Sequence, residues 1–388
     1  MNKRFKVLFI TAWYPTKGSP VGGTFVREHA KAVRQYDDIV LLHVVGNDLM
    51  IKNWWKIEKE SDEKLIEGIS TYRLWYRRRS NSHISYFIYI WSVFRAFRYI
   101  IRKEFRPDII HAHIYETAVP AVIIGRLYNI PVIVTEHYSV FPRKLLQGFD
   151  RLKAKIAFKF AKLVIPVSQF LQQAIESYGI KAQFTVIPNA VNTKIFFPSK
   201  ETKQVGDLIR LLTVSSFDKT NIKGLPYLFN ALSMLQKQRE DWHLEIIGDG
   251  ITRIEYEGIV NDSRLREKVT FHGYKNKEEV AKFMRQSDIF VISSLFETFS
   301  VATAEALTTG LPILATRCGG PEGFVNENVG LLIPPRDAEA LRNGLSYMMA
   351  NLKNFSTDYI SKYSASLFSF EHVGKRFHDI YLDCMKNN

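Results

Sequence analysis

The chain alternates short, continuous apolar runs with segments of helical spacing, and this rhythm constrains its fold more than any other feature. The runs in the first half are FKVLFITA, IVLLHVV, PDIIHAH, IPVIVTEH and LVIPVSQ. Because Val, Ile and Leu occupy consecutive positions, we expect both faces of these strands to be buried, which is typical of a parallel sheet. Helices between the strands then cover both faces, so we predict a doubly wound α/β domain.

A second series of the same kind follows the segment 184–207, whose tail is polar, lacks periodicity and is typical of a linker. Its runs are IRLLTVSS, HLEIIGDG, KVTFHGY, DIFVISS, LPILATR and VGLLIPP. A chain of 388 residues is long enough for two domains. We therefore predict two Rossmann-like domains, 1–195 and 196–367, facing each other across a deep cleft that suits a nucleotide ligand. The last segment, 368–388, has the spacing of an amphipathic helix.

The net charge of +14 is unevenly distributed. Residues 1–200 contain 31 Lys and Arg against 15 Asp and Glu, whereas residues 201–388 contain 22 against 24. This asymmetry predicts two domains with different partners. Two cysteines, Cys318 and Cys384, cannot make a disulfide framework and indicate a reducing, cytoplasmic compartment.

The N-terminal NKRFK followed by VLFITA resembles the start of a signal peptide, but its apolar part is too short, and a first buried strand fits better. The longest apolar-rich stretch, 84–94, is too short to span a bilayer. We therefore expect no membrane-spanning segment.

The stretch ETFSVATAEAL carries two carboxylates, Glu297 and Glu305, after the strand DIFVISS. We predict that a helix begins here with Thr298 or Ser300 as its N-cap. The free amides near its start, at Phe299, Ser300 and Val301, would then bind an anion such as a diphosphate.

The two glutamates are eight positions apart, so on one helix their side chains would point about 80° apart and would not form an acid/base pair. Carboxylates on either side of a diphosphate suit recognition of hydroxyls, of a sugar by Glu297 and of a ribose by Glu305. In the alternative interpretation, Glu305 is a buried ion-pair residue and Glu297 a solvated turn residue.

A lysine is placed to meet the same phosphate. Lys223-Gly224 follows the strand IRLLTVSS and opens a helix, as a phosphate-facing lysine should. The alternative is an ordinary surface lysine. The chain has no G-x-x-x-x-G-K-[ST] segment, so this is not a P-loop.

Taken in order, these segments resemble a known family. SLFETFSVATAEALTTGLPILATRCGGPEGFVNENVGLLIPP resembles the signature of glycosyltransferase family 4, retaining enzymes of the GT-B fold, with its E-x7-E pair, Gly-x-Pro strand and Gly-Gly turn. VIPNAVNTKIFFP resembles the segment that links the two domains, and WYPTKGSPVGGTFV resembles the first Gly-rich loop. The resemblance implies that domain 1–195 binds an acceptor, that domain 196–367 binds a nucleotide sugar, and that helix 368–388 crosses back to the first domain.

The resemblance also implies roles for individual residues. Glu297 would contact the donor sugar, Glu305 the ribose, and Lys223 the developing charge on the diphosphate. The remaining donor-binding positions would be the amides named above, Ser216, Tyr274 beside the base, and Gly22 and Gly23, which let a loop approach the donor; His137 would lie near the reacting centre. Ser215-Ser216 stands where the family has Gly-Arg, so its second cation is missing, and Ser300 replaces a common glycine.

We therefore predict a retaining transferase that moves a hexose or N-acetylhexosamine from a nucleotide-diphosphate sugar, UDP favoured over GDP, to a lipid-linked or polysaccharide acceptor in cell-surface glycan biosynthesis. No nucleophile pair stands out, which favours front-face substitution. No D-x-D is present, so we expect no metal and no cofactor. Alternatives are an epimerase or sugar-phosphate synthase on the same fold, or a basic nucleic-acid-binding protein, for which the chain shows no motif.

Two histidines, His111 and His113, stand at i, i+2 on one predicted strand and therefore point to one face. Metal sites use this spacing. Since no third ligand is evident, we interpret them as core or cleft histidines.

Basic residues gather around an aromatic run in the first half, and they lie at 77–79, 95, 98, 102, 103 and 106. A helix-like segment, RLKAKIAFKFAK, adds a stripe of Arg151, Lys155, Lys159 and Lys162. Basic residues beside aromatics suit an anionic membrane surface, so we predict a peripheral protein on the inner face of the membrane, with a glycolipid or oligosaccharide acceptor. The alternative is a solvated basic face.

Overall fold

The computed structural model describes residues 3–47, 54–77, 82–199 and 208–386. The chain forms two compact units: unit 1 comprises Met1–Ala190 and Phe370–Asn388, and unit 2 comprises Val191–Ser369. The sequence placed the corresponding boundaries after residues 195 and 367. The predicted tail of the linker, 200–207, lies outside the described residues.

Unit 1 is built on a seven-stranded sheet with the order β3-β4-β2-β1-β5-β6-β7. All neighbouring strands are parallel except β3 and β4, which are antiparallel. The strands are β1 (Lys6–Thr11), β2 (Asp38–Asn47), β3 (Trp55–Lys59), β4 (Ser70–Tyr76), β5 (Ile109–His113), β6 (Val132–Glu136) and β7 (Leu163–Pro166). The continuous apolar runs therefore form the parallel sheet that their pattern predicts, and β1 is the first buried strand.

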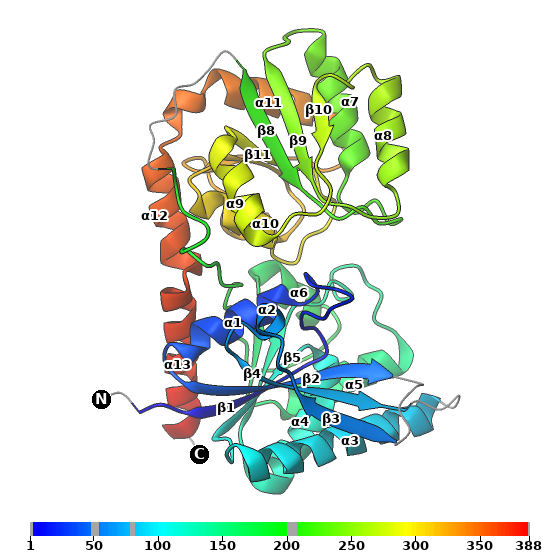
Figure 1. The fold of residues 1–388 in the computed structure, drawn as a ribbon, viewed down its shortest axis with the longest axis vertical. Coiled ribbons are helices and arrows are strands. Elements are labelled where there is room, and N and C mark those ends of the chain that lie inside the picture. The colour runs from blue at the N-terminus through cyan, green and yellow to red at the C-terminus, as the bar shows by residue number, and fades with distance from the viewer. Residues whose placement is uncertain (1–2, 48–53, 78–81, 200–207, 387–388) are drawn as a thin grey trace. The chain divides into compact units, whose positions relative to one another are not determined.

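Helices cover both faces of this sheet (Figure 1). The helices of unit 1 are α1 (Thr24–Arg34), α2 (Glu63–Ile66), α3 (Ser82–Lys103), α4 (Tyr115–Tyr128), α5 (Gly148–Phe160), α6 (Gln169–Glu176) and α13 (Phe370–Lys386). α1 and α13 lie together on one face, where Val7 and Phe9 of β1 share a core with Phe377 and Tyr381. α3 and α4 lie on the opposite face (Figure 1).

The last helix, α13, belongs to unit 1 although it follows unit 2 in the chain. Its amphipathic spacing buries Val373, Phe377, Tyr381 and Cys384 against the core of unit 1. Gly374 permits close packing on α1, because a Cβ there would lie 2.2 Å from the carbonyl oxygen of Ala32.

Unit 2 is built on a six-stranded, fully parallel sheet with the order β10-β9-β8-β11-β12-β13. The strands are β8 (Ile209–Val214), β9 (Trp242–Ile247), β10 (Val269–Phe271), β11 (Ile289–Ile292), β12 (Ile313–Thr316) and β13 (Gly330–Ile333). The helices are α7 (Leu225–Gln236), α8 (Arg253–Asp262), α9 (Lys277–Gln286), α10 (Val301–Thr308), α11 (Ala338–Ala350) and α12 (Thr357–Phe368), with short 3-10 helices at Gly320–Gly323 and Leu352–Asn354. α7 and α8 lie on one side of the sheet, and α9 and α10 on the other (Figure 1).

Within the described ranges, the structure contains no helix that combines the length and the apolar character needed to cross a membrane. Cys318 and Cys384 are both free and buried.

Candidate functional site

The start of α10 presents backbone donors that have no partner among the described residues. Ser300 is the N-cap, one of the two positions predicted, with φ +73°. Its hydroxyl pairs with Thr303 Oγ1 at 2.7 Å instead of capping the helix. In the parts of the chain that the structure describes, the amides of Phe299, Ser300 and Val301 make no hydrogen bond. Three such donors at the positive end of a helix are suited to bind an anion.

The turn before α10 is held by the segment after β12. Glu297 N donates to Cys318 O at 2.8 Å, and Gly320 N donates to Glu297 O at 2.8 Å. A Cβ on Gly320 would lie 2.4 Å from Cα of Phe299, so only glycine permits this close approach. The Gly-Gly turn therefore fixes the backbone that carries Glu297 and the three free amides.

Lys223 and Glu297 form an ion pair, with Lys223 Nζ 2.7 Å from Glu297 Oε1. The hydroxyl of Ser294 donates to the same oxygen at 2.8 Å. Burial lowers the pKa of Lys223, but the Glu297 carboxylate more than offsets this effect, so the net pKa is raised and the lysine stays charged. Lys223 is thus no ordinary surface lysine, and Glu297 is no solvated turn residue.

Gly224 brings the lysine to this position. It has φ +64°, and a Cβ there would lie 2.1 Å from the carbonyl oxygen of Ser293 at the end of β11. The hydroxyl of Ser293 in turn donates to Lys223 O at 2.8 Å. The loop from β8 to α7 therefore packs directly on the loop from β11 to α10.

Glu305 is buried on α10 and pairs with Lys277, whose Nζ lies 3.3 Å from Glu305 Oε1. The sequence left open whether this carboxylate reads a ribose or belongs to a buried ion pair, and the structure places it in an ion pair. Sequence reasoning missed Lys277. The available signal was the capping box of Asn276 and Glu279, which fixes Lys277 as the first residue of α9.

Ser216 follows β8 and Tyr274 follows β10, the strands on either side of β9, and both residues are exposed. Gly248, after β9, connects the two loops: a Cβ there would lie 1.7 Å from Ser215 O, and Gly248 N donates to Gly273 O at 2.9 Å. Both residues therefore lie at the carboxyl edge of the sheet of unit 2, the edge at which β11 leads to α10.

In unit 1, Gly22 and Gly23 lie in the loop before α1. Gly23 has φ +67°, and a Cβ there would lie 2.3 Å from the carbonyl carbon of Trp13. A Cβ on Gly22 would lie 2.6 Å from Ser19 Oγ. The packing of the loop on its own backbone thus requires Gly23, whatever the loop binds.

His137 follows β6 directly, and the buried Glu136 holds its backbone. The Glu136 carboxylate accepts hydrogen bonds from the amides of Tyr115, His137 and Tyr138, each at 2.9 Å. Burial raises the pKa of Glu136 to about 7, although the three amides act in the opposite direction. Sequence reasoning did not single out Glu136, because nothing in the strand IPVIVTEH shows that its last carboxylate points inward.

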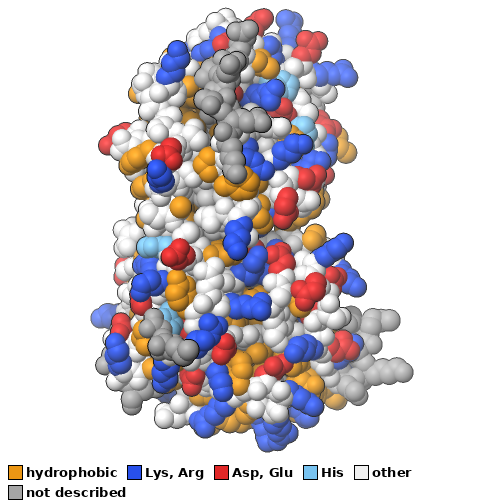
Figure 2. Space-filling view, turned by 60° about the vertical axis from the view of Figure 1, so that its left-hand side comes forward, with side chains coloured by type: hydrophobic (Ala, Val, Ile, Leu, Met, Phe, Trp, Pro, Cys, Tyr) orange, Lys and Arg blue, Asp and Glu red, His pale blue; other side chains and the backbone are white. Residues whose placement is uncertain are grey.

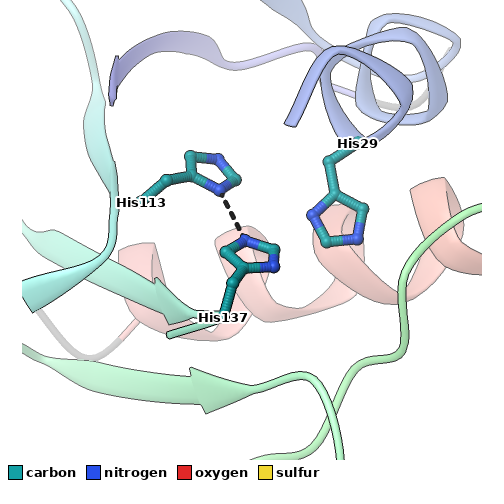
Figure 3. A group of neighbouring side chains, drawn as sticks. All are labelled: His29, His113 and His137. Atoms are coloured by element: carbon teal, nitrogen blue, oxygen red, sulfur yellow. Dashed lines mark hydrogen bonds between the residues drawn. The ribbon is translucent and has the colours of Figure 1, made fainter. Parts of the chain in front are cut away.

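His137 belongs to a group of buried histidines on the face of the sheet that α1 and α13 cover. His111 and His113 share one face, as predicted, with their rings stacked at 4.7 Å. Both ring nitrogens of His111 have hydrogen-bond partners, the hydroxyls of Tyr381 and Thr135, each at 2.7 Å. His113 Nδ1 instead lies 3.1 Å from His137 Nε2 (Figure 3), and His29 of α1, which the sequence did not indicate, lies beside this pair.

Unit 1 also exposes an aromatic–basic surface, which we define as Trp54, Ile84, Phe87, Ile88, Trp91 and Arg95. Phe87 is 76% exposed, and a groove of about 190 Å³ lies between Trp54, Phe87, Ile88 and Trp91. Arg95 lies over the rings of Trp55 and Trp91, at 4.7 and 4.8 Å. Figure 2 shows Lys and Arg side chains scattered among hydrophobic ones on the face of the molecule that it draws. Arg78 and Arg79 lie outside the described residues.

The helix α5 carries Arg151, Lys155 and Lys159 of the predicted basic stripe, whereas Lys162 lies beyond its last residue. The apolar side of α5 is not buried as a whole. Ala154, Ala157 and Phe158 pack inward, while Leu152 and Phe160 are exposed. Tyr86 of α3 contacts Phe149 of α5, with ring centroids 5.4 Å apart. Exposed apolar side chains thus continue from the aromatic–basic surface onto α5.

Two family models match the chain. Glycosyltransferase Family 4 matches residues 57–195, and Glycosyl transferases group 1 matches residues 209–351. One similar protein is the putative teichuronic acid biosynthesis glycosyltransferase TuaC of Bacillus subtilis, which is 25% identical over 88% of each chain. Another is the UDP-Gal:alpha-D-GlcNAc-diphosphoundecaprenol alpha-1,3-galactosyltransferase of Escherichia coli, which is 26% identical over 64% of this chain and 67% of that one. The solved structure of HepE from Anabaena in complex with UDP and glucose shares the fold, with a TM-score of 0.76, 17% identity and coverage of 98% of this chain and 100% of that one.

Proposed function

Because the chain belongs to the family 4 glycosyltransferases of the GT-B fold, we propose that it transfers a hexose or N-acetylhexosamine from a nucleotide-diphosphate sugar, with retention of configuration, to a lipid-linked or polysaccharide acceptor. Two of its relatives are named for teichuronic acid biosynthesis and for transfer to a diphosphoundecaprenol-linked sugar. These names support a role in the synthesis of cell-surface glycans. UDP is the favoured nucleotide, because it appears in the name of the second relative and in the complex of HepE.

One observation carries this proposal: Lys223 and Glu297 form a 2.7 Å ion pair beside the unused amides of α10. A diphosphate at these amides would bring two negative charges near Lys223 Nζ and compete with Glu297 for it. Glu297 would then be free to accept hydrogen bonds from the hydroxyls of the sugar. Binding of the donor thus replaces an internal ion pair with two contacts to the ligand.

The proposed reaction is a front-face substitution. The bond between the sugar C1 and the diphosphate oxygen breaks, the acceptor oxygen attacks C1 from the same face, and the departing diphosphate oxygen takes the acceptor proton. Lys223 and the three amides stabilise the charge that develops on the diphosphate. We propose that this step needs no metal ion, since a lysine and a helix N-terminus supply the positive charge.

The ribose and the base of the donor would lie along the same sheet edge. Glu305 would accept hydrogen bonds from the ribose hydroxyls while Lys277 balances its charge. The exposed ring of Tyr274 would cover the base, and Ser216 would lie where the family has an arginine. In unit 1, His137 and the loop of Gly22 and Gly23 would contact the sugar or the acceptor.

A donor panel tests the proposal. Thermal unfolding with UDP-, GDP- and ADP-sugars should show stabilisation by one nucleotide, and that donor should then label a polyprenyl-diphosphate saccharide. NMR of the product should show the anomeric configuration of the donor. An inverted product, or isomerisation of the donor without transfer, contradicts the proposal.

We propose that the aromatic–basic surface places unit 1 on the anionic inner face of a membrane, where a lipid-linked acceptor is held. Exposed apolar rings beside Arg95 suit the headgroup region. Flotation with anionic vesicles should decrease with salt and with Phe87→Ser. The matched control is Ile254→Ser on α8, which removes an 85% exposed apolar side chain from unit 2. Equal loss in both variants, or flotation independent of salt, contradicts the assignment.

A further inference from the structure

Three histidines converge inside unit 1 from three different elements: His29 from α1, His113 from the end of β5, and His137 from the loop after β6. One ring nitrogen of each lies within 4.8 Å of those of the other two. The side chains of His29 and His113 are 0% exposed and that of His137 is 6% exposed. Figure 3 shows the three rings gathered around a common space, with His113 and His137 joined directly.

We propose that His29, His113 and His137 bind a divalent transition metal of the Zn²⁺ class through one ring nitrogen each. Imidazole is a preferred ligand of Zn²⁺, Cu²⁺ and Ni²⁺, whereas Mg²⁺ and Ca²⁺ prefer oxygen ligands. Three protein nitrogens leave a fourth position for water or another small donor, as in open zinc sites.

The hydrogen bond of His29 fixes which of its nitrogens is available. His29 Nε2 lies 3.1 Å from the carbonyl oxygen of Pro188. Since a carbonyl only accepts, Nε2 carries the proton, and Nδ1 of the neutral ring keeps its lone pair. His29 Nδ1 is buried and has no hydrogen-bond partner among the described residues. A backbone carbonyl that orients a ligating histidine in this way is a common feature of metal sites.

His113 and His137 share one proton across their 3.1 Å contact, and each keeps a second nitrogen that lacks a partner among the described residues. Together with His29 Nδ1, three ring nitrogens are therefore buried and unsatisfied in one place. A buried polar atom without a partner costs about 1–3 kcal/mol, and such atoms are rare in folded proteins. A bound cation gives His29 Nδ1 a partner and takes the lone pairs of His113 Nδ1 and His137 Nε2 in place of the proton between them.

The spacing of the pair suits a shared metal. Two nitrogens on a tetrahedral Zn²⁺, each about 2.0–2.1 Å from it, lie about 3.3 Å apart, close to the 3.1 Å between His113 Nδ1 and His137 Nε2. When these two nitrogens face the metal, the His137 proton moves to Nδ1. The side chain of Asn189 lies close enough to His137 to raise the pKa of that histidine. Asn189 Oδ1 also lacks a partner among the described residues, so it is suited to accept a hydrogen bond from the proton on His137 Nδ1.

Protons do not compete for this site at neutral pH. Burial lowers the pKa of His29 to about 4 and the pKa values of His113 and His137 well below their ordinary range. The rings therefore remain neutral, which is the form that binds metal. Metal binding at this cluster and the proposed transfer reaction both involve His137, but metal binding is measured without a sugar donor, so the failure of one can be told apart from the failure of the other.

The experiment uses the full chain without an affinity tag, stripped of metal by EDTA and dialysed. Titration with Zn²⁺ by calorimetry should show one equivalent bound, Co²⁺ should give visible d–d absorption, and Mg²⁺ should give no heat. His29→Phe keeps an aromatic ring in the core and should weaken Zn²⁺ binding at least about tenfold, since even indirect partners of metal ligands contribute that much. The matched control is the double variant His243→Gln, His272→Gln, which removes the histidines that contact Glu245 in unit 2 and should bind Zn²⁺ normally.

Absence of one-equivalent binding overturns the proposal, as does binding that survives His29→Phe but is lost in the control. If His29→Phe does not fold, ¹⁵N spectra of histidine rings in the unmodified protein decide the question. Zn²⁺ should then shift three buried rings, and a shift confined to other histidines overturns the assignment.

Discussion

Replacing Glu136 by glutamine should change how the stability of unit 1 depends on pH. Glu136 is fully buried and accepts three amide hydrogen bonds from the segments that carry Tyr115 and His137. Burial raises its pKa from an ordinary value of 4.5 to about 7 in the folded protein. Between these two values, the folded state binds a proton that the unfolded state has released. The free energy of unfolding contributed by this group is therefore full below pH 4.5 and is lost as pH rises through 7.

The size of the effect follows from the shift in pKa. One pKa unit corresponds to about 1.36 kcal/mol, so the wild-type protein should lose about 2.5 kcal/mol from this group between about pH 5 and pH 8. The glutamine side chain of the variant does not titrate, so the difference in unfolding free energy between wild type and Glu136→Gln isolates the contribution of Glu136. As pH rises from about 5 to 8, the unfolding free energy of the wild type should fall by about 2.5 kcal/mol relative to that of Glu136→Gln.

Urea unfolding followed by tryptophan fluorescence is the suitable assay. Five of the six tryptophans, at 13, 54, 55, 75 and 91, belong to unit 1, and Trp13 contacts Tyr138 with ring centroids 4.8 Å apart. A difference that stays constant across this pH range would refute the reasoning. A difference that moves in favour of the wild type would show that the three amides outweigh burial and lower the pKa of Glu136 below its ordinary value.

Three further outcomes are expected. Lys223→Ala should lower turnover about 10²–10³-fold, as loss of one preorganised charge stabiliser does. Lys237→Ala, at the other end of α7, should leave turnover unchanged. Near-normal turnover of Lys223→Ala would contradict the assignment. Lys277→Met removes the cation 3.3 Å from the buried Glu305 and should lower the unfolding free energy of unit 2 by about 1–3 kcal/mol, whereas a loss below about 0.5 kcal/mol would show that the pair adds nothing. Gly23→Ala should lower the melting temperature of unit 1, because its Cβ would lie 2.3 Å from Trp13. Gly18→Ala in the same loop should leave the melting temperature unchanged, because a Cβ there meets nothing within 4 Å. Equal melting temperatures of the two variants would argue against strain at Gly23.

The sequence predicted the two parallel sheets and the start of α10 because both depend on local patterns. Runs of Val and Ile predict strands buried on two faces, and Ser300 before VATAEAL predicts a helix N-terminus. The positions of Lys223 and Glu297 could also be inferred, since each stands in the loop between a strand and the following helix. Their direct contact could not, because it depends on how the loops after β8 and β11 pack through Gly224 and Ser293.

The histidine cluster shows where sequence reasoning stops. Spacing on β5 correctly placed His111 and His113 on one face, but it gave no information on the other residues that surround them. His111 is satisfied by Tyr381, 270 positions away in the chain, and the neighbours of His113 come from α1 and from the loop after β6. Contacts between residues so distant in sequence leave no periodic signal, so His29 could be found only in three dimensions.

The return of α13 to unit 1 has a consequence for synthesis on the ribosome. Residues 1–190 leave the ribosome first, but the core that Val7 and Phe9 share with Phe377 and Tyr381 cannot close until α13 has been made. Unit 2 is made in between and contains a complete sheet of its own. The order of folding should therefore run against the order of translation, with the middle of the chain reaching its native state before the beginning. A stop codon before Phe370 should then damage the histidine face of unit 1, through the loss of the hydroxyl that Tyr381 offers to His111, and leave unit 2 folded.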